Sequence, residues 1–225
     1  MEHDTAEAWE FGARLSERAR DDLARLGRHR RLPAGAFLFL EGTRSDTVVL
    51  VTSGRVKIFR SAEDGTEVVL AVRGPLALVG ELAVIDELPR SASVQCMEHT
   101  EFLVIGALEF IAFLHAHPQA MWSLLRIISG RLRDADSKRF EFGVYDTLGR
   151  VARLLVELSE RFGEPTETGV RIALPITQDE LASWVGASRE AVAKALRALR
   201  TQGFIRTERR TVTVLDVGAL RRHTF

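Results

Sequence analysis

The chain has 225 residues, enough for one large domain or two modest ones that each bury a core. Lys plus Arg and Asp plus Glu both total 31, so the net charge indicates no particular partner. The single cysteine, Cys96, excludes a disulfide framework and a cysteine-ligated iron–sulfur cluster within the chain. The sequence contains no run of about 18 apolar residues that could span a membrane. Residues 1–11 lack a signal-peptide pattern. We therefore expect a soluble cytoplasmic protein.

The first half of the chain changes from helical to strand-like patterning. Residues 7–28 are rich in Ala, Leu and Arg, with apolar positions at helical spacing, and predict an N-terminal helical segment. From Arg31 to Ile105 the pattern becomes a series of short apolar runs separated by turns that contain glycine. Many short strands of this kind predict a closed or sandwiched antiparallel architecture.

The stretch Val79–Val94 contains a candidate ligand site. Gly80 allows the backbone to approach a ligand closely, and the N–H groups that begin the following helical turn can bind an anion. Arg90 has a planar, permanently charged guanidinium that suits phosphate, and Glu81 can accept hydrogen bonds from a sugar hydroxyl. Together these groups predict a sugar-phosphate site, and the alternative is a pair of solvated surface charges around a turn.

A long helical pattern follows Pro118 and reaches Phe142. It contains seven positions spaced alternately four and three residues apart, which are Met121, Leu125, Ile128, Leu132, Ala135, Arg139 and Phe142. This heptad seam predicts a parallel coiled coil, and hence a homodimer through residues 118–142. The alternative is one helix packed on its own domain. Residues 143–146 predict a hinge, and Thr147–Phe162 an amphipathic helix.

The C-terminal part of the chain predicts a winged helix-turn-helix. Thr177 and Glu180 form the pattern of a capping box and open a helix that runs to Val185. Gly186 supplies the turn, and Ser188 caps a second helix that runs to about residue 202. Residues 203–214 predict two short strands, the wing. Basic residues outnumber acidic ones from Thr177 to the end, which favours nucleic acid as a partner.

The second helix of this motif begins with the residues expected to meet DNA. Arg189 can bond guanine O6 and N7, and Glu190 can accept from cytosine N4. Lys194 lies one turn further on the same face and can reach a base or a phosphate. The expected DNA-binding set is Thr177, Gln178, Ser188, Arg189, Glu190 and Lys194. The alternative is that these are exposed charges on a solvated helix.

Two motifs resemble those of one family. Val79–Val94, with Gly-Glu-Leu-Ala followed by Pro-Arg-Ser-Ala, resembles the phosphate-binding cassette of cyclic-nucleotide-binding domains, and Val185–Leu196 resembles the recognition motif of the Crp–Fnr transcription regulators. The chain is thus identified as a cyclic-AMP-receptor-like member of the Crp–Fnr superfamily. The resemblance implies an α+β fold with an antiparallel β-roll of the double-stranded β-helix (jelly-roll) type, a long dimerisation helix and a C-terminal winged helix-turn-helix. The expected boundaries are 1–117, 118–145 and 146–225.

The resemblance also implies roles for individual residues. Glu81 would hold the ribose 2′-hydroxyl and Arg90 the cyclic phosphate, with further cassette contacts from Gly80, Leu82 and Ser91. The positions expected near the purine are Ile58, Leu70, Arg73, Ala135 and Asp136. The family implies an allosteric regulator that binds cyclic AMP and a near-palindromic operator, with RNA polymerase as a further expected partner. Neither catalysis nor a bound metal is expected, since no nucleophile–base pair, HExxH or P-loop pattern occurs.

The departures from the family pattern concern the purine. Ala135 and Asp136 stand where the cyclic-AMP receptors carry Thr followed by Ser or Asn, and Arg73 replaces an apolar residue. A carboxylate at position 136 suits the adjacent N1–H and N2 donors of guanine, so cyclic GMP or another guanine nucleotide is an alternative effector. A second alternative is an Asp136–Arg73 ion pair that closes the purine pocket and leaves a nucleotide-independent DNA binder.

Overall fold

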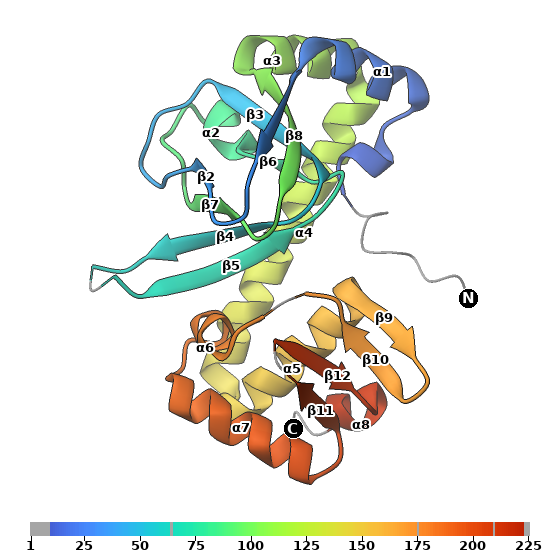
Figure 1. Ribbon diagram of the computed structural model, residues 1–225. Helices are drawn as coiled ribbons and strands as arrows, with labels where there is room; N and C mark the ends of the chain where they lie inside the picture. Colours follow the sequence, from blue (N-terminus) through green and yellow to red (C-terminus); the bar gives the residue numbers. More distant parts are fainter. Residues whose placement is uncertain (1–9, 64, 175, 209, 223–225) are drawn as a thin grey trace. The chain divides into compact units, whose positions relative to one another are not determined.

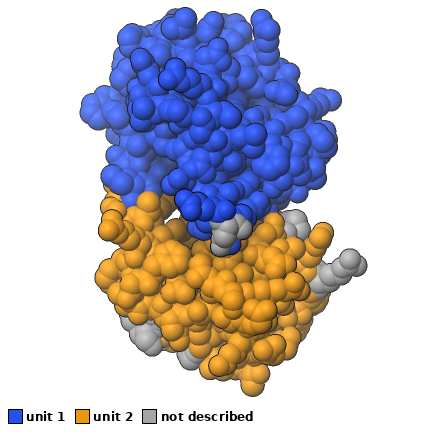
Figure 2. Space-filling view, turned by 90° about the vertical axis from the view of Figure 1, so that its left-hand side faces the viewer, with its two compact units in different colours: residues 1–132 blue, residues 133–225 orange. Residues whose placement is uncertain are grey.

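The structure is a computed structural model that describes residues 10–63, 65–174, 176–208 and 210–222. The chain divides into two compact units, residues 1–132 and 133–225 (Figure 2). No helix within the described ranges is long and apolar enough to cross a membrane. The architecture is the expected α+β fold, with a strand-rich N-terminal domain, one long helix and a C-terminal helix-turn-helix domain (Figure 1).

The N-terminal helical segment is shorter than the pattern predicts. A 3₁₀ turn, η2 (Gly12–Arg14), precedes α1 (Glu17–Leu26), which begins where the hydroxyl of Ser16 accepts a hydrogen bond from an N–H group of the first turn. The helical segment predicted over about 7–28 ends at Leu26, because β1 (Arg28–Leu32) begins at Arg28 and pairs with β8. Residues 7–9 lie outside the described residues.

Two four-stranded antiparallel sheets form the β-roll, in the orders β1-β8-β3-β6 and β2-β7-β4-β5. Apolar residues alternate along these strands and fill two clusters, one between the sheets around Val51 and Phe102, the other around Leu103 and Phe110 beneath the helices. The hairpin of β4 and β5 extends outward from the roll (Figure 1). The remaining strands of the roll are β2 Phe37–Phe39, β3 Thr47–Ser53, β4 Val56–Ser61, β5 Glu67–Arg73, β6 Leu78–Val79, β7 Ser93–Cys96 and β8 Thr100–Gly106.

Three helices complete the first unit and lead out of it. The short α2 (Glu81–Ile85) follows β6, α3 (Ala107–Ala116) follows β8, and α4 (Pro118–Val144) is continuous over 27 residues. The N-terminal half of α4 buries Leu124 and Ile127 against the apolar cluster that contains Phe110. The cassette is therefore fixed between the sheet that contains β6 and the long helix.

The second unit is a winged helix-turn-helix. Its helices are α5 (Thr147–Phe162), α6 (Gln178–Val185), α7 (Arg189–Thr201) and α8 (Val217–Arg222). A four-stranded sheet in the order β11-β12-β10-β9 contains β9 (Gly163–Thr166), β10 (Gly169–Ile172), β11 (Ile205–Glu208) and β12 (Thr211–Val214). Residues 163–169, which are mostly polar or glycine and have no strand pattern in the sequence, form β9 and the turn to β10. Leu155, Val192 and Leu199 are fully buried in this unit.

Candidate functional site

Gly80 is the backbone pivot of the cassette. It caps α2 in the left-handed conformation, with φ at +81°, which glycine adopts without the steric cost that a β-carbon brings. A β-carbon at this position would also collide with the guanidinium of Arg90 and lie 3.0 Å from the Phe39 ring. The glycine thus supplies both the turn into α2 and the space that Arg90 occupies.

Arg90 is drawn into the protein by neutral acceptors. Its guanidinium donates to the carbonyl oxygens of Gly80 and Thr47, each at 2.6 Å, and to the Ser45 hydroxyl at 2.5 Å. It also lies 3.8 Å from the centroid of the Phe39 ring, and only 3% of the residue is exposed. Its buried Nε has no hydrogen-bond acceptor among the residues that the structure describes. A phosphate is a charged acceptor and would bond such a group more strongly than the neutral oxygens do.

Burial and nearby carboxylates have opposite effects on the pKa of Arg90. Burial lowers the pKa of Arg90 from its usual value, and the carboxylates of Glu81 and Asp46 act in the opposite direction. A lowered arginine pKa still leaves the guanidinium charged at neutral pH. Arg90 is therefore a buried permanent cation in the cassette, as phosphate recognition requires.

Glu81 is equally buried, and it already has a partner. Only 3% of the residue is exposed, and its Oε1 lies 2.6 Å from Nη1 of Arg131 on α4. Arg131 also donates to the carbonyl oxygen of Leu78 at 2.9 Å, and Glu10 lies 3.9 Å away. The cassette carboxylate is thus tied to the long helix across 50 residues of sequence.

Arg131 is a site residue that the sequence did not reveal. Its neighbours on α4 read as an ordinary mixture of charged and apolar residues, and no local pattern links it to Glu81. Only the packing of α4 against β6 and α2 brings the two side chains together. Among the cassette residues named from sequence, Leu82 and Ser91 are exposed. Glu81 and Arg90 are buried, and Arg90 donates to the carbonyl oxygen of Gly80.

The positions expected near the purine are distributed over both units. Ile58 is half-buried against the β-roll core, Leu70 is exposed, and Arg73 is buried, with Nη1 bonded to the carbonyl of Val72. Ala135 and Asp136 are exposed on the part of α4 that belongs to the second unit. The ion pair between Asp136 and Arg73 stays a hypothesis.

The helix-turn-helix begins with the predicted capping box. The Glu180 N–H donates to the Thr177 hydroxyl at 3.1 Å, and the Thr177 N–H donates to the Glu180 carboxylate at 2.7 Å. Gly186 ends α6 in the left-handed conformation, and the hydroxyl of Ser188 accepts from the Ala191 N–H at the start of α7. Both predicted helices therefore have the expected N-caps, and the turn has the expected glycine.

The start of α7 carries exposed charges. Arg189, Glu190 and Lys194 are all exposed, as is Gln178 at the start of α6. Arg189 forms an ion pair with Asp179 at 3.5 Å, and both side chains are more than 60% exposed. A pair this exposed is weak and leaves the guanidinium available to a base edge.

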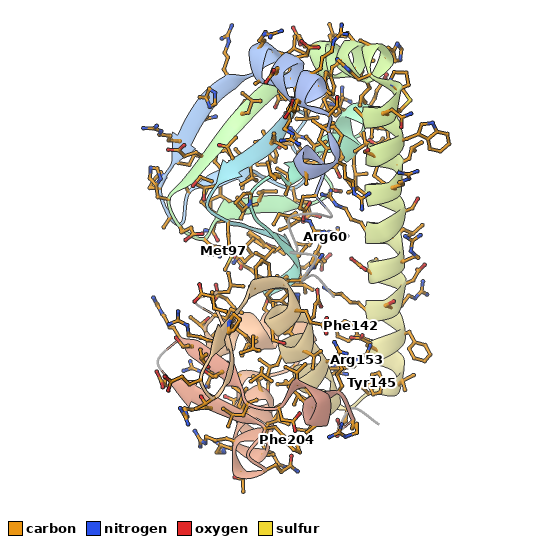
Figure 3. All side chains as sticks on the ribbon, turned by 90° about the vertical axis from the view of Figure 1, so that its right-hand side faces the viewer. Arg60, Met97, Phe142, Tyr145, Arg153 and Phe204 are labelled. Carbon is orange, nitrogen blue, oxygen red and sulfur yellow. The ribbon has the colours of Figure 1, made fainter. Side chains whose placement is uncertain are left out.

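The end of α4 packs on this motif within the second unit. A β-carbon on Gly186 would lie 2.7 Å from the Phe142 ring, and the guanidinium of Arg150 lies 5.2 Å from the centroid of the same ring. Arg153 bonds Glu141 at 2.7 Å and lies over the Tyr145 ring (Figure 3). The last turn of α4 is therefore held by α5 and by the turn of the helix-turn-helix.

Comparisons with known proteins assign both regions. Residues 29–117 match the model of the cyclic nucleotide-binding domain, and residues 149–223 match that of the Crp-like helix-turn-helix domain. The chain belongs to the Crp–Fnr family of transcription regulators. It is 35% identical to the CRP-like cAMP-activated global transcriptional regulator of Mycobacterium tuberculosis, over 84% of this chain and 85% of that one.

Two further relatives agree with this assignment. The regulator is 34% identical to the cyclic AMP receptor protein of Thermus thermophilus, over 91% of this chain and 92% of that one. Its fold also matches the solved c-di-GMP-responsive global regulator CLP of Xanthomonas campestris, with a TM-score of 0.77 and 26% identity, over 89% of this chain and all of that one. The predictions of a cyclic-nucleotide-binding fold and a DNA-binding transcription regulator are confirmed, and this family consists of transcription regulators rather than enzymes.

Proposed function

We propose that this regulator is a homodimeric switch in which a cyclic nucleotide bound at the cassette controls binding of the two helix-turn-helix motifs to a near-palindromic operator. The observation that carries the effector part is Arg90, a buried cation whose Nε lacks an acceptor among the described residues. Cyclic AMP is the first candidate, because two relatives over 30% identical are named as a cyclic AMP receptor or as cAMP-activated.

Glu81 and Arg131 supply a route from the ligand to the long helix. A ribose hydroxyl that donates to Glu81 approaches the carboxylate that Arg131 already binds at 2.6 Å. Ligand binding therefore changes a contact made by α4 itself. Such a change shifts the equilibrium only if the ligand binds the DNA-competent state more tightly than the other state.

The homodimer is proposed through α4. Leu125 and Leu132 of the predicted seam are 49% and 63% exposed in the single chain, and Trp122 beside them is 59% exposed. Met121 and Ile128 already pack partly on the β-roll core, and Phe142 packs on Gly186. A second copy would cover the remaining apolar positions, and its two-fold axis would place two α7 helices in successive major grooves.

Contacts to DNA would come from the start of α7. Arg189 is placed to bond a guanine, Glu190 a cytosine, and Lys194 a base or a phosphate. Thr177, Gln178 and Ser188 would contact the phosphate backbone of the DNA. They lie at helix N-termini, where N–H groups bind phosphates. RNA polymerase is the further partner that a transcription regulator of this type would contact.

A second candidate is a nucleotide-independent DNA binder, favoured by the ion pair that satisfies Glu81 without a ligand. Cyclic GMP is the alternative effector, favoured by the carboxylate of Asp136. Calorimetric titration of the full chain with cyclic AMP, cyclic GMP and cyclic di-GMP distinguishes these candidates. Binding of one nucleotide, together with tighter operator binding in a gel shift when it is present, supports the switch. The absence of heat with all three refutes it.

A further inference from the structure

One exposed face of α4 differs from the heptad that the sequence pattern predicts. The helix is continuous from Pro118 to Val144, and its N-terminal half buries Leu124 and Ile127 against its own domain. The opposite face is exposed at seven positions spaced alternately three and four residues apart. These positions, which we call the exposed stripe, are Trp122, Leu125, Ser129, Leu132, Asp136, Arg139 and Gly143. Their spacing is that of the core positions of a two-stranded coiled coil.

The stripe contains mainly apolar residues in its first half, with Ser129 among them, and two charged residues further on. Asp136 and Arg139 are exposed, and neither has a hydrogen-bond or ion-pair partner within the ranges that the structure describes. They are three residues apart on one helix, yet they do not pair with each other. By contrast Lys138 and Glu141, on the side of α4 that faces α5, pair with Glu157 at 3.9 Å and Arg153 at 2.7 Å. The charges that lack partners thus include two adjacent core positions of the stripe.

A second copy of the chain supplies the missing partners. In a parallel two-stranded coiled coil, each core side chain packs between core residues of the facing helix, including the next core position along. Asp136 of one copy then lies beside Arg139 of the partner subunit, and the two-fold axis repeats the contact in the other direction. We propose that Asp136 and Arg139 form this reciprocal ionic layer across the α4 seam. The inference rests on the homodimer proposed above.

Charge complementarity favours this occupant. Either residue alone at a core position would place two like charges face to face across the two-fold axis, which is unfavourable. The two together, with opposite signs at successive core positions, form two ion pairs. A shift of one helix by a heptad would place Arg139 opposite Leu132 of the partner subunit and leave Asp136 and Arg139 unpaired. Unpaired charges are unfavourable in a seam from which water is largely excluded. The layer therefore fixes the parallel register. For Asp136, this role in the dimer is an alternative to the contact with a guanine base described above.

Charge exchange tests the pairing. The full chain is studied by sedimentation velocity over a range of concentrations, as wild type, Asp136→Arg, Arg139→Asp and the double variant with both changes. Each single variant creates a layer of four like charges and is expected to raise the dimer dissociation constant by at least about tenfold. The double variant restores opposite charges and is expected to return within about threefold of wild type. Asp134→Asn, on the same helix but outside the stripe, is the control and is expected to leave dimerisation unchanged.

The outcomes separate this inference from the homodimer itself. Single variants that dimerise like wild type overturn the ionic layer and leave the homodimer intact. Single variants that dissociate, with no recovery in the double variant, also overturn the pairing, since both residues then matter but not to each other. A monomeric wild type refutes the homodimer, and the ionic layer fails with it. Circular dichroism of each variant checks that loss of the dimer is not loss of fold.

Discussion

The ion pair between Glu81 and Arg131 leads to a quantitative prediction. Glu81→Gln removes the charge of a residue that is 3% exposed, while the Arg131 side chain that it binds is 22% exposed. Hydrogen bonds to charged groups contribute about 1.5–3 kcal/mol, and Gln keeps a neutral acceptor in place. We therefore expect Glu81→Gln to lower the free energy of unfolding of the first unit by about 1–2 kcal/mol. Glu98→Gln, which weakens the more exposed pair with Arg55 at 3.2 Å, whose two side chains are 42% and 30% exposed, is the control and should cost less than about 0.5 kcal/mol.

A double-mutant cycle isolates the pair. Urea unfolding is measured for wild type, Glu81→Gln, Arg131→Gln and the double variant. Because the two side chains contact each other, the double variant should lose at least about 1 kcal/mol less than the sum of the single losses. Additivity within about 0.3 kcal/mol would refute the interaction. The same Glu81→Gln protein should bind its cyclic nucleotide about tenfold more weakly by calorimetry, since a ribose hydroxyl loses a charged acceptor.

Three further predictions concern other parts of the regulator. Gly80→Ala should lower stability by about 1–2 kcal/mol in urea unfolding and weaken nucleotide binding, because φ is +81° and a β-carbon displaces Arg90; unchanged binding would contradict this role. Arg189→Ala should cost about 1–3 kcal/mol at a specific operator in a gel shift, whereas Arg171→Ala, an exposed arginine on β10, serves as the control; equal losses would refute base reading. Cys96 is 2% exposed and burial raises its pKa, so the thiol stays protonated at neutral pH; iodoacetamide should modify it slowly in the native protein and rapidly in urea, and rapid native modification would contradict its burial.

The elements that the sequence predicts best are those with local chemical signals. The helix from Gln178 to Val185 begins and ends as predicted, because a capping box and a glycine in the left-handed conformation mark its two ends. The cassette is similarly recognisable, since its glycine, acid and arginine lie within 11 residues of one another in sequence. Local hydrogen bonding and backbone strain are encoded in short stretches, so short stretches suffice to predict them.

Other features depend on the tertiary structure. The α3 helix contains a nearly continuous apolar run, with Phe110, Phe113 and Leu114 buried, and such a run has no clear period of its own. The β9 strand contains Gly163 and Pro165, which read as a loop until pairing with β10 is seen. The role of Arg131 depends on a contact with a residue 50 positions away. In each case the deciding interaction is made with a distant part of the chain.

The heptad prediction on α4 also depends on contacts that the sequence pattern does not show. The spacing of apolar residues on α4 does not reveal which of them the chain itself will cover. Met121 and Ile128 contact the β-roll core, so the face left for another molecule is rotated relative to the predicted seam. In the homodimer that we propose, that rotation would bring Asp136 from a position beside the seam into its centre.

The contact between Phe142 and Gly186 restricts how this regulator can vary. The glycine meets two separate demands, a φ of +59° at the turn and room for an aromatic ring from the end of α4. A side chain at position 186 requires the ring at 142 to move aside or to become smaller, and even then the strain of the turn remains. A damaging substitution at the turn should therefore have partial suppressors at position 142, and a genetic selection for restored repression or activation would recover them there.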